Sequence, residues 1–363
     1  MKNTFGNNIS VTLFGESHGP MIGATVDGVA SGIQIDIEYI KRCLDARKAY
    51  GRISTARQET DEPIFISGVL NGFTTGTPIT ILIENKNASS KEYSELYDTP
   101  RPSHADYTAY AKYGECRDAR GGGHFSGRIT AALVAAGAIL RRALEDKSIF
   151  IGTHISRLCG ISDRAFENIK EDLSILSERR FPVLDNNAAS LMAKKIEETA
   201  NEGDSVGGVL ESAVVGLPVG IGEPWFDTLE GVISHAVFSV PSVKGIEFGA
   251  GFGFANMLGS EANDPISTDG EKIFTLTNNN GGINGGISNG MPIIFRTAIK
   301  PTPSIYKPQQ SVSLSRMENK ELTISGRHDP AIIHRARAVI DAVTAIAISD
   351  MLVTKYGTDW LKN

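Results

Sequence analysis

The hydrophobic residues that follow Arg128 recur at the spacing of a helix. They are three or four residues apart, at Ile129, Leu133, Ala136, Leu140 and Leu144. Most of the residues between them are alanine or aliphatic, and two basic residues, at positions 141 and 142, lie towards the expected C-terminal end. Because nearly every face is apolar, this pattern predicts a helix that is buried on all sides.

Three more segments combine helical spacing with a residue that can cap the helix. The expected helices run from 37 to about 47, from about 187 to 201, and from 330 to about 356. The expected N-caps are Asp36, Asp185 and Asp329. Pro330 is suited to the first turn of the last helix, and Gly357 is suited to its C-terminal end.

Shorter segments that alternate between apolar and polar residues, or are rich in β-branched residues, predict strands. The clearest are residues 10–14, 21–29, 63–70, 78–83, 207–217 and 291–300. Together with the helices they predict a mixed α/β or α+β fold. No repeat or low-complexity linker divides the chain, so a single domain over residues 1–363 is expected.

Composition places the chain among soluble globular proteins. Of its 363 residues, 41% are hydrophobic and 21% are charged. A net charge of −6 without a long basic tract argues against nucleic acid as the main partner. No apolar run reaches the roughly 18 residues of a membrane span and no signal peptide is evident, so a cytoplasmic location is expected. The three cysteines lack CxxC spacing, which suggests neither disulfides nor zinc.

Residues with chemical potential are densest over positions 101–128. This segment holds four arginines, two histidines, a glycine triplet and a serine just before the predicted buried helix. Fixed cations and the backbone N–H groups of a helix start are suited to anionic ligands. In a protein of net negative charge, they predict one pocket for a small and strongly anionic molecule.

Three histidines lie in turns where an imidazole could transfer a proton. His18 is expected on an exposed turn between two strands, His104 follows Pro102, and His328 precedes Asp329. Histidine titrates near neutrality, so each is a candidate acid or base, and a solvated surface residue is the alternative for each. No HxH or HxxxH spacing occurs, so no metal site is expected.

Two glycine-rich motifs fit common sites only in part. Residues 15–19 read Gly-Glu-Ser-His-Gly and match the G-x-S-x-G pattern of serine hydrolases, but a β-rich segment follows where that site requires a helix. Residues 281–286 do not match G-x-G-x-x-G and precede no helix, which disfavours a Rossmann fold. Beyond them, three side chains could bind a phosphate group: Lys300, Thr302 and Ser304.

Taken together, the motifs resemble those of the chorismate synthase family over nearly the whole chain. They occur in the family's order at residues 15–19, 67–72, 74–78, 101–106, 117–130, 203–208, 222–227, 243–249, 300–304 and 327–330. The resemblance implies an α+β fold, a β-α-β sandwich rather than a Rossmann sheet. It implies a lyase of the shikimate pathway that converts 5-enolpyruvylshikimate 3-phosphate (EPSP) into chorismate and phosphate by 1,4-anti elimination. Reduced FMN is the implied cofactor, without net redox change.

The resemblance also implies roles for individual residues. His18 would protonate the departing phosphate, His104 would keep the reduced flavin in its reactive protonation state, and Asp329 would assist removal of the substrate proton. The implied substrate-binding residues are Arg47, Arg101, Ser126, Gly127, Arg128 and Arg327. The implied cofactor-binding residues are Arg47, Arg52, His124, Phe125, Ser126, Ser242, Gly285, Lys300, Pro301, Thr302, Pro303, Ser304 and Arg327.

The chain departs from the family pattern at two places. Many members have Arg-Pro-Gly after the first arginine, whereas residues 47–52 read Arg-Lys-Ala-Tyr-Gly-Arg here and are about one residue shorter. A pyridine-nucleotide role for Arg52 therefore lacks its usual sequence setting. Many members also have arginine where this chain has His124, which predicts a flavin contact whose charge depends on pH.

The resemblance further implies a homotetramer with EPSP as its small-molecule partner. Because no appended domain or nucleotide motif is apparent, NADPH is expected only as an indirect source of reduced flavin. Two alternatives stay open at this point. One is a flavin-dependent oxidoreductase, which would consume a reductant in each turnover. The other is a non-catalytic protein that binds anionic metabolites.

Overall fold

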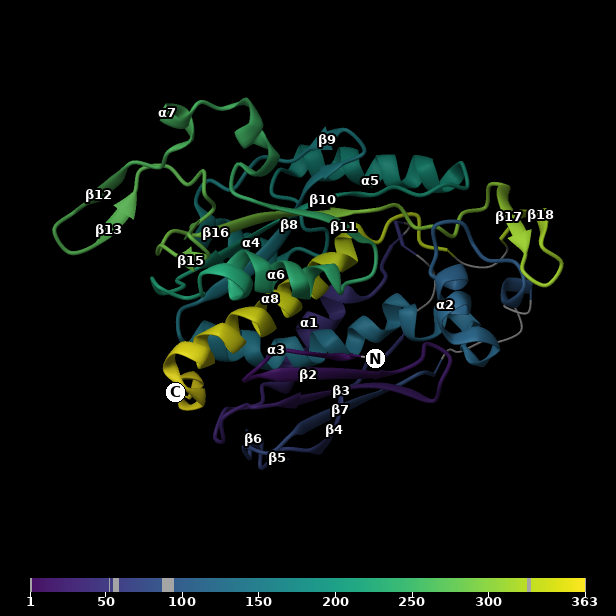
Figure 1. The fold of residues 1–363 in the computed structure, drawn as a ribbon, viewed down its shortest axis with the longest axis horizontal. Coiled ribbons are helices and arrows are strands. Elements are labelled where there is room, and N and C mark those ends of the chain that lie inside the picture. The colour runs from purple at the N-terminus through teal and green to yellow at the C-terminus, as the bar shows by residue number, and fades with distance from the viewer. Residues whose placement is uncertain (1, 52, 55–58, 87–94, 325–327, 363) are drawn as a thin grey trace.

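The computed structural model describes residues 2–51, 53, 54, 59–86, 95–324 and 328–362. Their elements form three layers, in which helices lie between two β-sheets (Figure 1). All strand pairs in these ranges are antiparallel, which is incompatible with the parallel sheet of a Rossmann fold. Within them, no helix is both long and apolar enough to cross a membrane.

The first sheet has five strands in the order β1-β2-β3-β7-β4. In that order their bounds are Thr4–Phe5, Ser10–Gly15, Met21–Asp27, Ile79–Glu84 and Ile64–Ser67. In β7 buried and less buried residues alternate, as expected when one face packs on helices. The strands predicted over 10–14, 21–29 and 78–83 are confirmed.

The strand predicted over 63–70 is wrong in its extent, because it is split at Gly68. This glycine has φ of 78°, outside the strand region, and separates β4 from β5 (Val69–Leu70), which pairs instead with β6 (Phe73–Thr74). A Cβ at this position would lie 2.6 Å from the backbone of Ile79. Only glycine therefore fits where the chain leaves the first sheet.

The second sheet has five strands in the order β11-β16-β10-β8-β9. In that order their bounds are Val243–Phe248, Ile293–Ile299, Gly208–Val215, Phe150–Leu158 and Ile161–Ser162. The strands predicted over 207–217 and 291–300 are confirmed. The sequence reading missed β8, because its residues from Ile151 to Ile155 are buried on both faces and give no alternation.

Three helices fill the layer between the sheets: α1 (Ile37–Arg47), α3 (Thr130–Asp146) and α8 (Ile333–Tyr356). Helix α3 packs on the first sheet, α8 packs on the second, and the two pack on each other. Every residue of α3 from Thr130 to Leu140 is buried, which confirms the helix predicted after Arg128. At their contact, a Cβ on Gly137 would lie only 2.6 Å from that of Ala342.

Two of the three predicted N-caps are confirmed. The carboxylate of Asp36 accepts from the N–H of Tyr39, and that of Asp185 accepts from Ala188 at the start of α5 (Asn186–Asn201). The prediction for Asp329 is wrong, because the N-cap position of α8 is Ile332. The carbonyl of Pro330 accepts from the N–H of Val206, so this proline is bonded to the chain before β10 and lies outside the helix.

The remaining elements surround the sandwich. Helix α4 (Ile169–Glu178) packs on β8, and α6 (Leu229–Phe238) packs on α8 and β11. The others are α2 (Asp106–Tyr113), α7 (Gly259–Ala262), and the strands β12 (Ile266–Thr268), β13 (Ile273–Thr275), β14 (Ile283–Asn284), β15 (Ile287–Ser288), β17 (Gln309–Ser313) and β18 (Glu318–Leu322). The β12–β13 and β17–β18 hairpins extend from opposite ends of the molecule (Figure 1).

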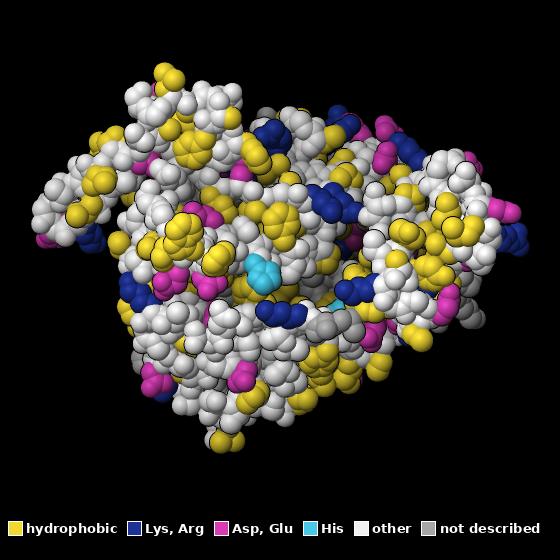
Figure 2. Space-filling model, in the orientation of Figure 1, with side chains coloured by type: hydrophobic (Ala, Val, Ile, Leu, Met, Phe, Trp, Pro, Cys, Tyr) yellow, Lys and Arg dark blue, Asp and Glu magenta, His cyan; other side chains and the backbone are white. Residues whose placement is uncertain are grey.

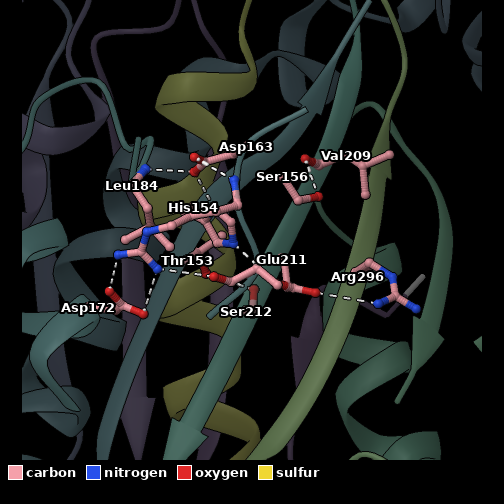
Figure 3. A network of polar contacts seen from close by, with 12 residues as sticks. Thr153, His154, Ser156, Asp163, Asp172, Leu184, Val209, Glu211, Ser212 and Arg296 are labelled. Atoms are coloured by element: carbon pink, nitrogen blue, oxygen red, sulfur yellow. Dashed lines mark hydrogen bonds and ion pairs between the residues drawn. The ribbon is translucent and has the colours of Figure 1, made fainter. Parts of the chain in front are cut away.

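A row of charged side chains crosses the second sheet (Figure 3). His154 on β8 lies between two carboxylates, with Nδ1 2.8 Å from Asp163 Oδ2 and Nε2 3.1 Å from Glu211 Oε2. Glu211 on β10 also pairs with Arg296 on β16. Burial lowers the pKa of the fully buried His154, but the two carboxylates outweigh it and raise that pKa above its ordinary value. None of these four residues lines the cavity described next.

Candidate active site

A cavity of about 1390 Å³ lies between the first sheet, the start of α3, the end of α6 and α8. In Figure 2 a recess near the centre of the face is bordered by Lys and Arg side chains. Many of the predicted site residues line the cavity: Arg47, His104, His124, Phe125, Ser126, Gly127, Arg128, Ser242, Lys300, Thr302, Pro303, Ser304 and Asp329. Segments far apart in the sequence therefore meet at one site.

Other predicted residues do not line this cavity. Four are described but absent from the lining: His18, Arg101, Gly285 and Pro301. Gly285 lies in the turn between β14 and β15, where its φ is 61°. Arg52 and Arg327 fall outside the residues that the structure describes. Their predicted roles stay predictions.

The glycine triplet forms an irregular 3-10 turn before α3. Gly121, Gly122 and Gly123 have φ of 58°, 91° and 54°, all in the left-handed region that favours glycine. A Cβ on Gly121 would lie 2.2 Å from His18 Cε1, and one on Gly122 would lie 3.2 Å from His104 Cε1. The missing side chains thus allow both candidate histidines to approach the same loop.

His18 is buried, and the expectation of an exposed imidazole is wrong. The imidazole packs against Gly121. The loop that carries His18 is bonded to the glycine triplet, because the N–H of Ser17 donates to the carbonyl of Gly123 at 3.1 Å. Ser17 Oγ donates to the carbonyl of Arg120 and lies 3.0 Å from His18 Nδ1. Strand β3 follows this loop, so Ser17 lacks the strand-turn-helix setting of a hydrolase nucleophile.

His104 is fixed by Asp106 and Arg101. The Nδ1 atom of His104 lies 2.7 Å from Asp106 Oδ1, and Asp106 also accepts two hydrogen bonds from the Arg101 guanidinium. Burial, Arg101 and Lys300 outweigh Asp106 and lower the pKa of His104, which favours the neutral imidazole. The Arg101 guanidinium is thus paired with Asp106, next to the candidate catalytic residue His104.

Arg47 and Arg128 come from different elements and meet at Asp61. Arg47 Nη2 donates to one oxygen of this carboxylate at 3.0 Å, and Arg128 Nη1 donates to the other. All three side chains are almost completely buried, and all three residues line the cavity. One anion is therefore shared by two cations, which leaves an excess positive charge at the cavity wall.

The loop after β16 supplies a further cationic and hydroxyl-rich part of the lining. Lys300 donates its backbone N–H to the carbonyl of Ser242 at 2.9 Å, and its ammonium group contacts the carbonyl of Ser103. Burial and the neighbouring Lys244 lower the pKa of Lys300. Thr302 Oγ1 is buried and has no hydrogen-bond partner among the described residues. Such an atom needs a partner, which a bound ligand could supply.

Asp329 is held by Arg335 of α8. The two form an ion pair, and Arg335 also donates from Nε to the backbone carbonyl of Arg47 at 2.9 Å. Arg335 therefore connects the candidate carboxylate with the helix that carries Arg47. His328 lies next to Asp329 in the cavity lining.

Comparisons with known proteins identify the relatives of this chain. Residues 9–353 match the model of the family described as chorismate synthase. Curated chorismate synthases from Thermococcus gammatolerans and Dehalococcoides mccartyi are 44% and 45% identical, over 96% and 97% of this chain and 97% and 96% of theirs. The chain belongs to the chorismate synthase family. A crystal structure of chorismate synthase matches with a TM-score of 0.75 and 27% identity, covering 98% of this chain and 94% of that one.

Membership of the chorismate synthase family confirms several expectations. The α+β sandwich agrees with the solved structure, and the enzyme class is the lyase that converts EPSP into chorismate. The two alternatives, an oxidoreductase and a non-catalytic binder, disagree with these matches.

The sequence reading did not identify several charged residues of the cavity. Asp61, Lys244 and Arg335 line it, and Asp106 lies just behind His104. Asp61 and Asp106 lie near arginines in the sequence, but such spacing is common on protein surfaces and does not indicate a shared buried carboxylate. Lys244 is part of a motif that the chain shares with chorismate synthases, although the motif alone gives it no role.

Proposed function

We propose that the cavity is the catalytic site and binds EPSP next to reduced FMN. The observation that carries this proposal is the meeting of His104, Asp329, the Arg47–Arg128 pair and the loop at 300–304 around one space of about 1390 Å³. Ligand pockets usually measure about 300–1,000 Å³, so this one has room for a cofactor and a substrate together. The phosphate and two carboxylates of EPSP match its excess of cations.

The loop after β16 fits the phosphate and polar side chain of FMN. Lys244 and Lys300 place two cations at this part of the lining, and the buried Thr302 Oγ1 offers a hydroxyl that has no partner among the described residues. Phe125 is 42% exposed, which leaves an aromatic face for a flat ring. When bound, reduced FMN supplies the electron-rich ring that the family's elimination requires.

His104 is suited to accept a proton at Nε2. His104 Nδ1 lies 2.7 Å from the carboxylate acceptor Asp106 Oδ1 and 3.0 Å from the donor Arg101 Nη2, and the shorter contact with the carboxylate favours a proton on Nδ1. The lowered pKa of His104 favours the neutral ring. A neutral ring with its proton on Nδ1 has its basic site at Nε2, on the side of Gly122. This geometry suits a group that sets the protonation state of a cofactor next to it.

His18 is suited to donate a proton from its imidazolium form, in which both ring nitrogens carry a proton, if a ligand reaches it past Gly121. The hydroxyl of Ser17 donates to the carbonyl of Arg120, so its oxygen accepts from His18 Nδ1 at 3.0 Å. This leaves Nε2 as the atom that would exchange a proton with a departing phosphate. The arginine pair, Arg47 and Arg128, would stabilise the negative charge that develops there.

Asp329 is positioned to act as the carboxylate of the reaction. It lines the cavity, and its ion pair with Arg335 of α8 holds the carboxylate at the cavity wall. Arg101, Arg327 and Arg52 are further candidate ligand contacts, although Arg101 is bound by Asp106 in this structure.

The assembly and location belong to the same proposal. The protein would be a cytoplasmic homotetramer that takes reduced flavin from an external reductase, with NADPH as an indirect electron source. Trp225 and Phe226 are adjacent in the sequence and are 84% and 96% exposed, and neighbouring exposed apolar side chains suit a subunit contact. The described cysteines are free, which suits a reducing compartment. One hydrophobic core contains residues of both sheets and supports a single domain over 1–363.

The site assignment can be tested by separating flavin binding from turnover. Lys300→Ala should weaken the binding of oxidised FMN, measured by quenching of flavin fluorescence, because it removes a cation from the proposed phosphate site. Lys307→Ala is the matched control, since Lys307 pairs with Asp204 outside the cavity. His104→Ala should bind oxidised FMN but lose turnover by about 10²–10⁴-fold. Unchanged FMN binding in Lys300→Ala, or full turnover in His104→Ala, would place the chemistry elsewhere.

A further inference from the structure

Asp61 is the shared partner of the arginine pair, and its carboxylate is completely buried. The Arg47 and Arg128 side chains are 7% and 4% exposed, so this ion triad is almost free of solvent. A buried charge is costly unless it is paired, and an arrangement of two cations with one anion stays incompletely neutralised. The triad of Arg47, Asp61 and Arg128 keeps a net positive charge next to the cavity.

The arginine pair is also held by neutral acceptors that leave part of each guanidinium available. Arg47 Nη1 lies 3.3 Å from both the carbonyl of Gly127 and Thr130 Oγ1. Its Nε atom is buried and has no partner among the described residues. Each guanidinium has five N–H donors, and the contacts of Arg47 in the described chain use three. Two of its donors, one of them the buried Nε, therefore have no partner among the described residues, and a buried donor of this kind needs one.

The guanidinium of Arg128 likewise uses only some of its N–H donors in contacts within the described chain. Its Nε donates to Asn85 Oδ1 at 2.8 Å, its Nη2 donates to the carbonyl of Glu84 at 3.0 Å, and its Nη1 donates to Asp61. These contacts fix the guanidinium plane while they use three of its five N–H groups. The two arginines therefore have fixed orientations, and Asp61 is the group that sets one relative to the other.

The backbone at Asp61 supplies independent support. Its φ is 50°, in the left-handed region that residues with a Cβ rarely adopt, although Asp tolerates it better than most. Unfavourable backbone conformations persist where the surrounding structure requires them, and they concentrate at functional sites. Here the conformation accompanies a carboxylate that lies between the two arginines.

The electrostatics show what the carboxylate does for its partners. Burial, together with Arg335 and Arg128, lowers the pKa of Arg47 to about 10, and Asp61 opposes this change. The charged groups that act on Arg47 are thus Asp61, which precedes β4, Arg128, which precedes α3, and Arg335 on α8. In turn, the pKa of Asp61 is lowered, because the two arginines outweigh its burial.

We propose that Asp61 is a positioning residue that holds Arg47 and Arg128 together as one anion-binding site in the cavity wall. It would fix their separation and limit their mutual repulsion, while leaving donors for an anion. The identification of that anion as EPSP rests on the proposed function. The anion-binding role itself does not, because the triad, and the donors that have no partner among the described residues, are features of the structure alone.

Asp61→Asn is the decisive variant. Asparagine has nearly the same volume and also tolerates the left-handed conformation, so the substitution chiefly removes the charge. We expect KM for EPSP to rise at least about tenfold, and kcat to fall by less than KM rises. The alkaline limb of kcat/KM should move to lower pH, because Arg47 loses the group that raises its pKa. Binding of inorganic phosphate, measured by calorimetry, should weaken by a similar factor.

The matched control is Asp172→Asn. Asp172 is also a buried carboxylate paired with an arginine, Arg164, but it does not line the cavity. It should lower thermal stability and leave KM, the pH profile and phosphate affinity unchanged. If Asp61→Asn does not fold, Asp61→Glu is the variant that tests the positioning role. It keeps the charge and should raise KM without moving the alkaline limb, whereas an unchanged KM would overturn the proposal.

The outcomes separate this inference from the proposed function. If Asp61→Asn keeps wild-type KM and phosphate affinity, or binds more tightly, then Asp61 does not position the arginine pair and the inference fails. If the wild-type protein forms no chorismate but Asp61→Asn still loses phosphate affinity, the proposed function fails and the anion-binding role stands.

Discussion

Gly121 offers a direct test of whether His18 takes part in catalysis. In Gly121→Ala, the new Cβ would lie 2.2 Å from His18 Cε1, 2.5 Å from Nδ1 and 2.8 Å from Ser17 Oγ. Because carbon atoms in contact are usually about 3.5–4.0 Å apart, the imidazole would have to move by more than about 1 Å. The alanine would also keep a φ of 58°, where residues with a Cβ are strained.

The structure gives the expected size of both effects. Misplacement of a catalytic group by about 1 Å can cost about 10²-fold in rate, so kcat for chorismate formation should fall about a hundredfold. The free energy of unfolding should fall by about 2–5 kcal/mol, from about 1–2 kcal/mol of backbone strain and about 1–3 kcal/mol of overpacking. The assay follows chorismate formation with reduced FMN, and urea unfolding measures stability.

Gly32→Ala is the matched control for this prediction. Gly32 has φ of 90°, but a Cβ added there would have no atom within 4 Å, and the residue lies away from the cavity. It should therefore show the strain alone, with unchanged kcat. A folded Gly121→Ala enzyme with wild-type kcat would refute the assignment of His18 as the proton donor.

Three further predictions concern other parts of the structure. Asp106→Asn removes the group that raises the pKa of His104, so the acidic limb of the kcat–pH profile should move to lower pH; an unchanged limb would contradict the role of His104. His154→Gln should destabilise the protein most in acid: the raised pKa of His154 contributes stability that is fully present below about pH 6.5 and lost as the pH rises through the folded-state value. Urea unfolding at several pH values measures the difference in free energy of unfolding between the wild type and His154→Gln. This difference should shrink above neutrality rather than grow. Gly137→Ala would force α3 away from α8 and should lower the free energy of unfolding by about 1–3 kcal/mol, measured by thermal unfolding, whereas an unchanged melting temperature would contradict the close helix contact.

The sequence predicted elements whose signals are local. Helices α1, α3 and α5 were predicted from their spacing, and two were predicted with the correct caps, Asp36 and Asp185, because a cap acts on a residue three positions away. The start of α8 was placed too early. Asp329 and Pro330 form a typical helix-start pair, but a contact of Pro330 with the chain before β10 keeps them out of the helix. Strand β8 was missed because both of its faces are buried.

The candidate site shows the same limit. The resemblance identified most of the residues that line the cavity, including His104 and Asp329. Local patterns could not predict that His18 is buried, since its loop is covered by residues about a hundred positions later. Nor could they show that Asp61 joins two arginines, which are 14 and 67 positions away. These features depend on tertiary contacts, which local patterns in the chain do not encode.

The most direct test of the central claim is the number of chorismate molecules formed per reduced FMN. The protein would be incubated anaerobically with EPSP and a limiting amount of photoreduced FMN, with oxidised FMN as the control. The account predicts many turnovers per reduced flavin, release of one phosphate per chorismate, and no product with oxidised FMN. One turnover or fewer per reduced flavin, or binding of EPSP without product, would contradict it.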